Sequence, residues 1–576
     1  MNHLLVEYLK PHKKVLGLIA FLLLIQAVGT LYLPNLNADI INDGVVTGDT
    51  GYIIRVGAMM LAVSAVLGAA AIVAVYFSAR TAMRLGRDIR ADLFRRVESF
   101  SLSQMYGFGV PSLITRNTND VQQLQMLVMV GLTMMLLAPI TAVGGAVMAV
   151  RENVQLSALL LVMIPLMIGV ISLMIFKAIP LFRSMQVKID KVNGVLRENL
   201  TGIRVIRAFV KTSHEEARFQ DANDDLTATA LRVTRLFALM IPALMLIMYM
   251  ASVATIWFGG HLVADGSMPI GNMIAFQYYI ILILGSVMMA VMTLMMVPRA
   301  AAAGERIRRV LDTLPDITEP SSLDENVVFT GRIELRDVEF RYPGAQEPVL
   351  SDVSFTMAPG TTTAIVGGTG SGKTTLVNLL PRLMDVTSGQ VLIDGVDIKD
   401  IPLEQLWQLF GIVPQKAFLF TGTVGTNVRF GHPEATDAEV WAALDVAQAR
   451  EFVDELPDGL DSEIEQGGAN LSGGQRQRMA IARCLVRRPL IYLFDDSFSA
   501  LDYSTDARLR AALVEQTRES TVAIVAQRVR TIMDADQIVV LDAGRVVGLG
   551  RHEDLIEDCE PYREIVLSQM SLEEAG

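Results

Sequence analysis

Six long apolar stretches constrain this chain more than any other feature of its sequence. They lie near residues 15–40, 53–78, 126–150, 155–180, 236–262 and 272–297. Each is close to the roughly 20 residues that a helix needs to cross the hydrocarbon core of a bilayer. The composition agrees, because 52% of the 576 residues are hydrophobic and only 19% are charged. The sequence therefore predicts six membrane-spanning helices.

Charged residues predict on which side of the membrane the loops lie. Five arginines follow the second stretch: Arg84, Arg87, Arg90, Arg95 and Arg96. Three aspartates lie between the first and second stretches: Asp39, Asp43 and Asp49. The positive-inside rule then places both termini and the soluble part in the cytoplasm. We see no targeting extension and expect a bacterial plasma membrane, and the net charge of −12 gives no sign of a nucleic-acid partner.

The helical pattern continues past the membrane surface. Residues 53–100 contain no proline, and about 45 helical residues at ~1.5 Å each reach ~70 Å, far more than a bilayer core. After the last apolar stretch, "TEPSSLDENVVFTG" has the composition of a linker. We expect a helical membrane domain with long intracellular loops at 1–315, a linker at 316–330 and a soluble α/β domain at 331–576.

A glycine-rich loop between an apolar run and a helical pattern carries the first chemical signal. In "AIVGGTGSGKTT", four residues separate Gly367 from Gly372, Lys373 and Thr374. Such a loop surrounds phosphate oxygens with backbone N–H groups, while the lysine meets the β and γ phosphates and the threonine hydroxyl faces Mg²⁺. Nucleoside triphosphate binding is predicted for the whole loop: Gly367, Gly368, Thr369, Gly370, Ser371, Gly372, Lys373, Thr374 and Thr375.

A second apolar run, "PLIYLFDD", ends in two adjacent carboxylates, Asp495 and Asp496. In a fold that has a phosphate-binding loop, an aspartate at the end of a buried strand can hold Mg²⁺. We therefore predict that Thr374 and Asp495 take part in a magnesium site. The two cysteines, Cys484 and Cys559, do not have the spacing of metal ligands.

Further motifs resemble those of ATP-binding cassette transporters. The segment "LSGGQRQRMAIAR" resembles the family's signature motif through Leu471, Ser472, Gly473, Gly474 and Gln475. "FRYPG" has Tyr342 where the family has an aromatic ring that stacks on adenine. "IVPQ" has Gln415 at the Q-loop position, which implies a catalytic and magnesium-binding role, and "SALD" at 499–502 matches the D-loop. The apolar half is similar to the family's exporter-type membrane domain, so the resemblance covers nearly the whole chain.

The resemblance implies a half-transporter, in which one six-span membrane domain is joined to one α/β ATP-binding domain. In this family two such domains stack head to tail. Each ATP then lies between the phosphate loop of one domain and the signature motif of the other. The chain is thus expected to bind ATP and Mg²⁺ in a dimer of half-transporters within the lipid bilayer.

Three positions depart from the family's pattern. The family has a Glu that polarises the attacking water where this chain has Asp496, a switch-loop His where it has Gln527, and a Glu before the signature where it has Gln466. The missing methylene withdraws the carboxylate by roughly 1.5 Å, and misplacement on that scale can cost about 100-fold in rate. An amide can still donate a hydrogen bond, but it cannot titrate.

These departures lead to a hypothesis about the partner. We predict that Asp496 and Gln527 are impaired catalytic residues, whereas the signature motif is intact. The chain would then supply the degenerate nucleotide site of a heterodimer, and hydrolysis would occur mainly at the site that the partner completes.

The resemblance to exporters implies ATP-driven export. We expect a small apolar or amphipathic substrate, such as a lipid or a drug, because the spans are rich in methionine and poor in charge. Two alternatives stay open: a regulatory subunit that binds ATP without useful turnover, and an importer, for example of siderophores, on the same fold. A soluble cassette protein acting on nucleic acid is disfavoured by the six apolar stretches.

Overall fold

The computed structural model of the protein describes residues 2–320 and 327–569. The chain divides into two compact units. The membrane unit comprises Met1–Arg96 and Pro111–Thr313, and the α/β unit comprises Val97–Val110 and Leu314–Gly576. Part of the linker predicted at 316–330, namely residues 321–326, lies outside the described residues, as does the end of the predicted α/β domain at 570–576.

Among the described residues, six helical segments are long and apolar enough to cross a membrane, and they form nearly all of the membrane unit. They are His3–Val45, Thr50–Glu98, Val110–Glu152, Ala158–Thr201, Thr212–Ala264 and Ile270–Asp312. Each matches one of the apolar stretches in the sequence. The prediction of six spanning helices is therefore confirmed.

Several of these segments join more than one helical element. The first contains α1 (Asn2–Leu9), η1 (Lys10–His12), α2 (Lys13–Asp39) and η2 (Ile40–Val45). The third contains α5 (Val110–Thr115), η3 (Arg116–Asp120), α6 (Val121–Val130), η4 (Gly131–Met135) and α7 (Leu136–Glu152). The last contains α11 (Ile270–Leu294) and α12 (Val297–Asp312), and the others are single helices, α3 (Thr50–Glu98), α8 (Ala158–Thr201) and α10 (Thr212–Ala264).

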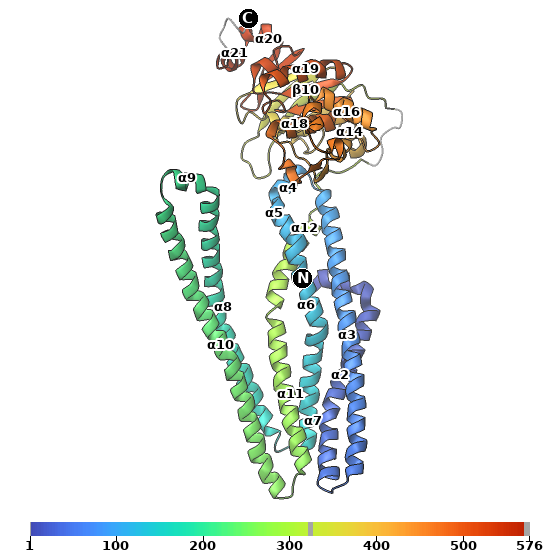
Figure 1. Ribbon diagram of the computed structural model, residues 1–576, viewed down its shortest axis with the longest axis vertical. Helices are drawn as coiled ribbons and strands as arrows, with labels where there is room; N and C mark the ends of the chain where they lie inside the picture. Colours follow the sequence, from blue (N-terminus) through green and yellow to red (C-terminus); the bar gives the residue numbers. More distant parts are fainter. Residues whose placement is uncertain (1, 321–326, 570–576) are drawn as a thin grey trace. The chain divides into compact units, whose positions relative to one another are not determined.

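Three helices are much longer than a bilayer requires. α3 has 49 residues, α8 has 44 and α10 has 53, which at ~1.5 Å per residue gives lengths of ~65–80 Å. α8 and α10 pack against each other, and the short helix α9 (Ile203–Ala208) closes their hairpin (Figure 1). The long helix expected over residues 53–100 is thus present as α3, whereas its position relative to a membrane surface stays a prediction.

The core of the membrane unit lies where α11 packs against α2, α7 and α10. Phe276, Tyr279 and Ile280 of α11 are fully buried there. The Tyr279 hydroxyl donates to the Leu31 carbonyl at 2.9 Å, which satisfies a polar group that would be costly to leave unpaired in apolar surroundings. This pairing ties the sixth span to the first.

The α/β unit is built on two main sheets. A six-stranded, mostly parallel sheet has the order β12-β11-β3-β10-β9-β6, and a four-stranded antiparallel sheet has the order β2-β1-β4-β5. The first consists of β3 (Thr362–Gly367), β6 (Phe410–Val413), β9 (Ile491–Asp495), β10 (Thr521–Val525), β11 (Gln537–Asp542) and β12 (Arg545–Gly550). The second consists of β1 (Ile333–Phe340), β2 (Leu350–Met357), β4 (Ser388–Ile393) and β5 (Val396–Asp397). β7 (Gly422–Thr423) and β8 (Glu463–Ile464) form a two-stranded ribbon.

Helices complete the unit, as an α/β fold requires. They are α4 (Leu102–Phe108), α13 (Lys373–Leu379), α14 (Leu403–Leu409), α15 (Val424–Arg429), α16 (Asp437–Val446), α17 (Arg450–Asp454), α18 (Gly473–Val486), α19 (Tyr503–Gln516), α20 (His552–Asp558) and α21 (Glu560–Leu567). The predicted fold class, a six-span helical domain followed by an α/β domain, is confirmed.

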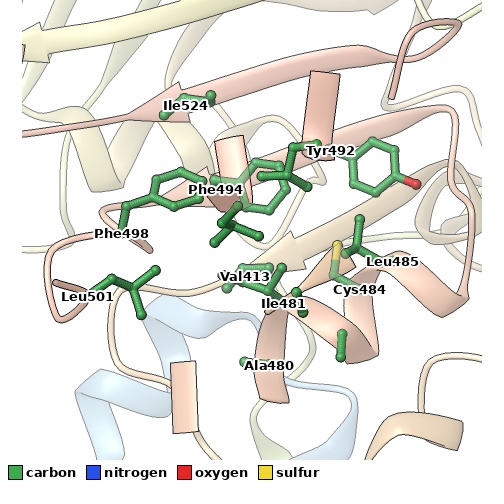
Figure 2. Packing of buried hydrophobic residues seen from close by; sticks show 14 of the residues in the cluster. Val413, Ala480, Ile481, Cys484, Leu485, Tyr492, Phe494, Phe498, Leu501 and Ile524 are labelled. Atoms are coloured by element: carbon green, nitrogen blue, oxygen red, sulfur yellow. The ribbon is translucent and has the colours of Figure 1, made fainter. Parts of the chain in front are cut away.

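The six-stranded sheet separates two hydrophobic cores. Alternate side chains of a strand point to opposite faces, so Tyr492 and Phe494 of β9 belong to one core and Leu493 to the other. Figure 2 shows Phe494 gathered with Val413 of β6 and Ile481 of α18 in the first core. All five residues of β9 are buried, which explains why the run before the two carboxylates is apolar throughout.

The helix α4 belongs to the α/β unit although the chain places it between the second and third spans. Ser101 caps it, and the Leu102 N–H donates to the Leu383 carbonyl at 3.1 Å. The Gln104 amide donates to the Leu314 carbonyl at 2.7 Å and to the Asp316 carboxylate at 2.9 Å. Hydrogen bonds on both sides of α4 therefore hold this segment, which joins the second and third spans in the chain, to the rest of the α/β unit.

Candidate functional site

The phosphate-loop motif forms the turn from β3 into α13, at the carboxyl end of the parallel strands. Gly370 and Gly372 have φ angles of 83° and 97°, a region that glycine adopts without a steric penalty. A Cβ on Gly367 would lie 2.1 Å from the Leu541 carbonyl oxygen, and one on Gly372 would lie 2.7 Å from the Leu350 side chain. A side chain at Gly367 or Gly372 would therefore clash with neighbouring atoms, whether or not a ligand is bound.

The Lys373 ammonium lies inside this loop. It donates to the carbonyls of Gly367 and Gly368 at 2.8 and 2.7 Å, and to the Ser371 hydroxyl at 3.3 Å. Burial lowers the pKa of Lys373, and the negative charges of Asp495 and Asp496 oppose that effect. The loop therefore holds an ammonium group on its own carbonyls, and this cation is the group that can pair with an anion such as a phosphate.

Thr374 and Asp495 come together as the sequence predicts. The Thr374 hydroxyl donates to Asp495 Oδ1 at 3.3 Å, and Asp495 is only 5% exposed. Burial is the main cause that raises the pKa of Asp495, and the Thr374 hydrogen bond and Lys373 oppose it. A hydroxyl and a buried carboxylate at hydrogen-bond distance offer the hard oxygen ligands that Mg²⁺ takes, so the residues present fit that ion.

Asp496 has a different environment from its neighbour. Its backbone is in the left-handed region, with a φ of 47°, and its N–H donates to the Val525 carbonyl of β10 at 2.9 Å. Asp tolerates this conformation better than most residues because its short side chain can bond locally. Burial is the largest influence on Asp496 and raises its pKa.

Two amides converge on the same oxygen of Asp496. Gln415 donates to Asp496 Oδ2 at 3.2 Å, and Gln527 donates to it at 3.0 Å. These contacts join the loop after β6 and the loop after β10 to the carboxylate after β9. An oxygen that already accepts two hydrogen bonds has little remaining capacity to accept a proton from an attacking water.

A cavity of about 510 Å³ opens at this place. Many of the predicted residues line it: Gly367, Gly368, Thr369, Gly370, Gly372, Lys373, Thr374, Thr375, Gln415 and Gln527. Tyr342, predicted to stack on a base, is not among the lining residues, and its hydroxyl lies 3.1 Å from that of Thr375, which is. The geometry therefore brings the phosphate loop, the Q-loop and the switch loop into one site.

The signature residues do not line this cavity, although all of them are among the described residues. Ser472 begins α18 as its N-cap and forms a capping box with Gln475, with hydrogen bonds of 2.8 and 3.2 Å. A Cβ on Gly473 would meet nothing within 4 Å, whereas one on Gly474 would lie 3.1 Å from the Ala500 carbonyl. Leu471 precedes the helix and is buried. The signature end of α18 is thus an open helix N-terminus, which attracts anions.

Gln466, the third departure, begins the short turn η6 (Gln466–Gly468) before the signature. The next N–H, of Gly467, donates to the Leu419 carbonyl at 2.9 Å. The turn therefore connects the signature region with the segment that follows the Q-loop.

Apart from Val366, which lies in β3 just before the loop, four residues that line the cavity carried no signal in the sequence. They are Val349, Ile565, Ser568 and Gln569. The last three come from α21 and the turn that follows it, at the end of the described chain. Their sequence, "IVLSQ", reads as an ordinary amphipathic helix, and only the fold brings it to the carboxyl edge of the sheet.

Protein-family models match both halves of the chain. Residues 16–287 match the ABC transporter transmembrane region, and residues 350–499 match the ABC transporter domain. The two matches fall in the helical and the α/β parts of the sequence, in the order that a half-transporter has.

Similar proteins extend the match to nearly the full length. An uncharacterized ABC transporter ATP-binding protein of Mycobacterium tuberculosis is 45% identical over 574 residues, 98% of each chain. An ATP-dependent lipid A-core flippase of Thiobacillus denitrificans is 31% identical over 570 residues, again 98% of each chain. A solved structure, that of a bacterial Atm1-family ABC exporter with ATP bound, has a TM-score of 0.80 at 25% identity and covers 97% of this chain and 98% of its own.

Proposed function

The chain belongs to the ABC transporter family, and we propose that it is one subunit of an exporter built from two different half-transporters. In this arrangement it supplies the nucleotide site with the weaker catalytic base. The single observation that carries the proposal is the pair of amides on Asp496 Oδ2.

Membership of the family indicates the general activity of the chain, ATP-driven transport. An exporter-type membrane region followed by an ABC ATPase domain makes the chain a multi-pass membrane protein and an ATP-driven transporter. One copy of each region is what a half-transporter contains.

The cavity at the phosphate loop is the proposed ATP site of this chain. Lys373 binds the β and γ phosphates, the N–H groups of the loop from Gly368 to Thr375 surround them, and the Tyr342 ring stacks on the base. Thr374, Asp495 and Gln415 hold Mg²⁺, which supplies charge neutralisation at the phosphates when bound. The bond of Lys373 to the Gly367 carbonyl and the bond of Thr374 to Asp495 support these roles.

Hydrolysis at this site is proposed to be slow. A catalytic carboxylate must accept a proton from water or orient it, and the Asp496 oxygen is already shared by Gln415 and Gln527. The side chain is also one methylene shorter than the Glu of the family's pattern. Gln527 can hold a phosphate or a carboxylate in place, but it cannot exchange a proton in the physiological range.

The signature end of the same domain has none of these departures, and this asymmetry supports a partner of different sequence. Leu471, Ser472, Gly473, Gly474 and Gln475 match the family motif, and they lie outside the cavity of their own chain. In a partner with Glu and His at the equivalent positions, the phosphate loop would face this chain's signature motif. The two would together form the competent site. A dimer of identical chains would have two slow sites.

The proposed substrate is a lipid or another amphipathic molecule. A relative at 31% identity is named as an ATP-dependent lipid A-core flippase. The six spans also expose many large apolar side chains and few charges, as expected of a protein that handles apolar cargo in the bilayer. Export is the proposed direction.

The membrane is proposed to be the plasma membrane of a bacterium, with both termini and the α/β unit in the cytoplasm. The arginines of α3 support this orientation. α4 supports a route for force, because it is bonded to the α/β unit and continues through the chain into the second and third spans.

The first test is the ATPase activity of the chain in two settings. Purified alone, the chain should hydrolyse ATP slowly. Co-expressed with a half-transporter encoded beside it, the pair should be active and should lose activity when the partner's own Glu is replaced by Gln. Brisk hydrolysis by the lone chain would show that Asp496 is a competent base and end the proposal.

A regulatory subunit is the second candidate, and the same pair of amides favours it. Such a subunit would bind ATP and support the partner without its own signature contributing to hydrolysis. A Ser472→Ala or Gly473→Glu change separates the two: the exporter proposal expects the pair's ATPase to fall, and the regulatory one expects it to persist.

A further inference from the structure

The segment that carries Gln527 is held from two sides, by the D-loop and by Gln569, a residue to which no motif assigns a role. This switch segment, residues 527–529, follows β10 and contains Gln527, Arg528 and Val529. The Gln527 side chain of this segment lines the cavity, and its amide donates to Asp496. Its other contacts determine where that amide can lie.

On one side, the switch segment is fastened to the D-loop of the same chain. Arg528 donates to the carbonyls of Ser499 and Leu501 at 3.1 and 3.4 Å. Its guanidinium also stacks on the ring of Tyr503, 5.1 Å from the centroid. Planar stacking together with several N–H donors is a geometry that arginine supplies and lysine does not.

On the other side, Gln569 fastens the same segment to the end of the C-terminal helix. Its Nε2 donates to the Gln527 carbonyl at 2.7 Å, and its Oε1 accepts from the Val529 N–H at 2.9 Å. An amide is the side chain that has a donor and an acceptor side by side, so it can bond a backbone carbonyl and a backbone N–H at once. The pair of bonds fixes the backbone on both sides of Arg528.

The helix that carries Gln569 is itself firmly anchored. Tyr562 and Val566 of α21 are fully buried in the first core of the α/β unit, and the Tyr562 hydroxyl lies 2.7 Å from His552 Nδ1. The Gln569 N–H donates to the Val566 carbonyl at 3.0 Å. Burial of two large side chains therefore holds the turn at Gln569 against the sheet.

We propose that Gln569 is a positioning residue for the nucleotide site, which acts by holding the switch segment so that the Gln527 amide faces Asp496 and the cavity. Retention of Mg-ATP by this chain then depends on the C-terminal helix. This inference rests on the proposed nucleotide site, and it adds a residue outside every motif of the family that we have described.

The test uses the full-length chain and a fluorescent ATP analogue with Mg²⁺. Gln569→Met keeps the length of the side chain and removes the amide, and Gln569→Glu keeps the acceptor but sets a carboxylate oxygen against the Gln527 carbonyl. Loss of a two-point hydrogen bond of this kind predicts dissociation of the analogue about three- to tenfold faster for both. Glu564→Gln, an exposed change on the same helix, is the matched control and should leave the rate unaltered.

A double-mutant cycle separates positioning from other roles. If Gln569 acts through Gln527, then Gln569→Met adds nothing in a Gln527→Ala background, because no amide is left to be positioned. Additive effects in the two backgrounds would overturn the proposal, since they would mean that Gln569 touches the nucleotide or merely supports the fold. Thermal melting of each variant records any structural loss.

The outcomes also distinguish this inference from the proposed function. Absence of analogue binding to the wild-type chain would contradict the proposed nucleotide site itself. Normal binding to the wild type together with an unchanged rate in both Gln569 variants would overturn the inference alone.

Discussion

The α/β unit contains two regions built to face phosphate, and they differ in what their sequences retain. The phosphate-loop region combines an ordinary loop and Lys373 with an altered pair, Asp496 and Gln527, whose side chains bond each other. The signature motif at the start of α18 matches the family's pattern, and its residues do not line the cavity of their own chain. Under the proposed function, the first region retains ATP binding, while the second supports hydrolysis at the site that the partner completes.

Removal of the phosphate-loop cation should produce the largest effect on this contrast. Lys373→Ala deletes a half-buried charge that would bind the β and γ phosphates, and we expect Mg-ATP affinity for this chain to fall about 100-fold. Equilibrium binding of a fluorescent ATP analogue measures it. Arg518→Ala, which removes an exposed cation before β10 and so at the opposite edge of the sheet, is the control. An affinity unchanged by Lys373→Ala would mean that this cavity is not the nucleotide site.

A change at the signature should act on the other ATP. Gly473→Glu adds bulk and negative charge at a position where a Cβ meets nothing within 4 Å in this chain, so the fold should persist. We expect the ATPase rate of the two-chain transporter to fall roughly 10- to 100-fold through repulsion of phosphate at a helix N-terminus. Analogue binding to the chain's own cavity should not change. A loss of that binding instead would show that the two regions are not independent.

Restoring the family's pair should reduce the contrast. Asp496→Glu combined with Gln527→His returns a longer carboxylate and a titratable partner to the cavity. We expect the ATPase rate of the chain purified alone to rise about tenfold, because proton transfer and placement of water each contribute factors of this size or more. Asp496→Asn with Gln527→His is the matched control without a base. If the restored pair is no faster than this control, then Asp496 is not what limits hydrolysis.

The smallest expected effect concerns stability and pH. Burial raises the pKa of Asp495. Ionisation of its buried carboxylate therefore lowers the stability of the folded state at neutral pH. This loss of stability disappears at low pH, where Asp495 is protonated in both the folded and the unfolded state. Asp495→Asn should therefore melt about 2–4 °C above the wild type at pH 7.5 without nucleotide or Mg²⁺, a change of ~1 kcal/mol. The difference should narrow as the pH falls below the raised pKa of folded Asp495, and it should vanish near the unfolded value of about 4.

Two results would contradict this account of Asp495. One is a lower melting temperature for Asp495→Asn at pH 7.5. The other is an equal shift for Asp542→Asn, which removes an exposed carboxylate at the end of β11.

The site was predictable to the extent that its residues are close together in sequence. The loop from Gly367 to Thr375 is one continuous segment, and the apolar run before Asp495 indicates a buried strand that ends beside it. The bonds from Gln415 and Gln527 to Asp496 connect residues 81 and 31 positions apart. Motif resemblance brought these residues to attention, but their convergence on one oxygen depends on the order of β6, β9 and β10 in the sheet.

The sequence by itself determined the division into six spans and an α/β domain. The length of an apolar stretch and the spacing of the glycines in the phosphate loop are local properties, so they can be recognised without knowledge of the tertiary structure. Through the motif resemblance the sequence also predicted the departures at Asp496 and Gln527. Only the tertiary structure decided that α4 is bonded to the α/β unit and that Gln569 holds the switch segment. These contacts join residues separated by 210 and 42 positions, and hydrogen bonds between such distant residues are selected by how the elements pack, which no local pattern encodes.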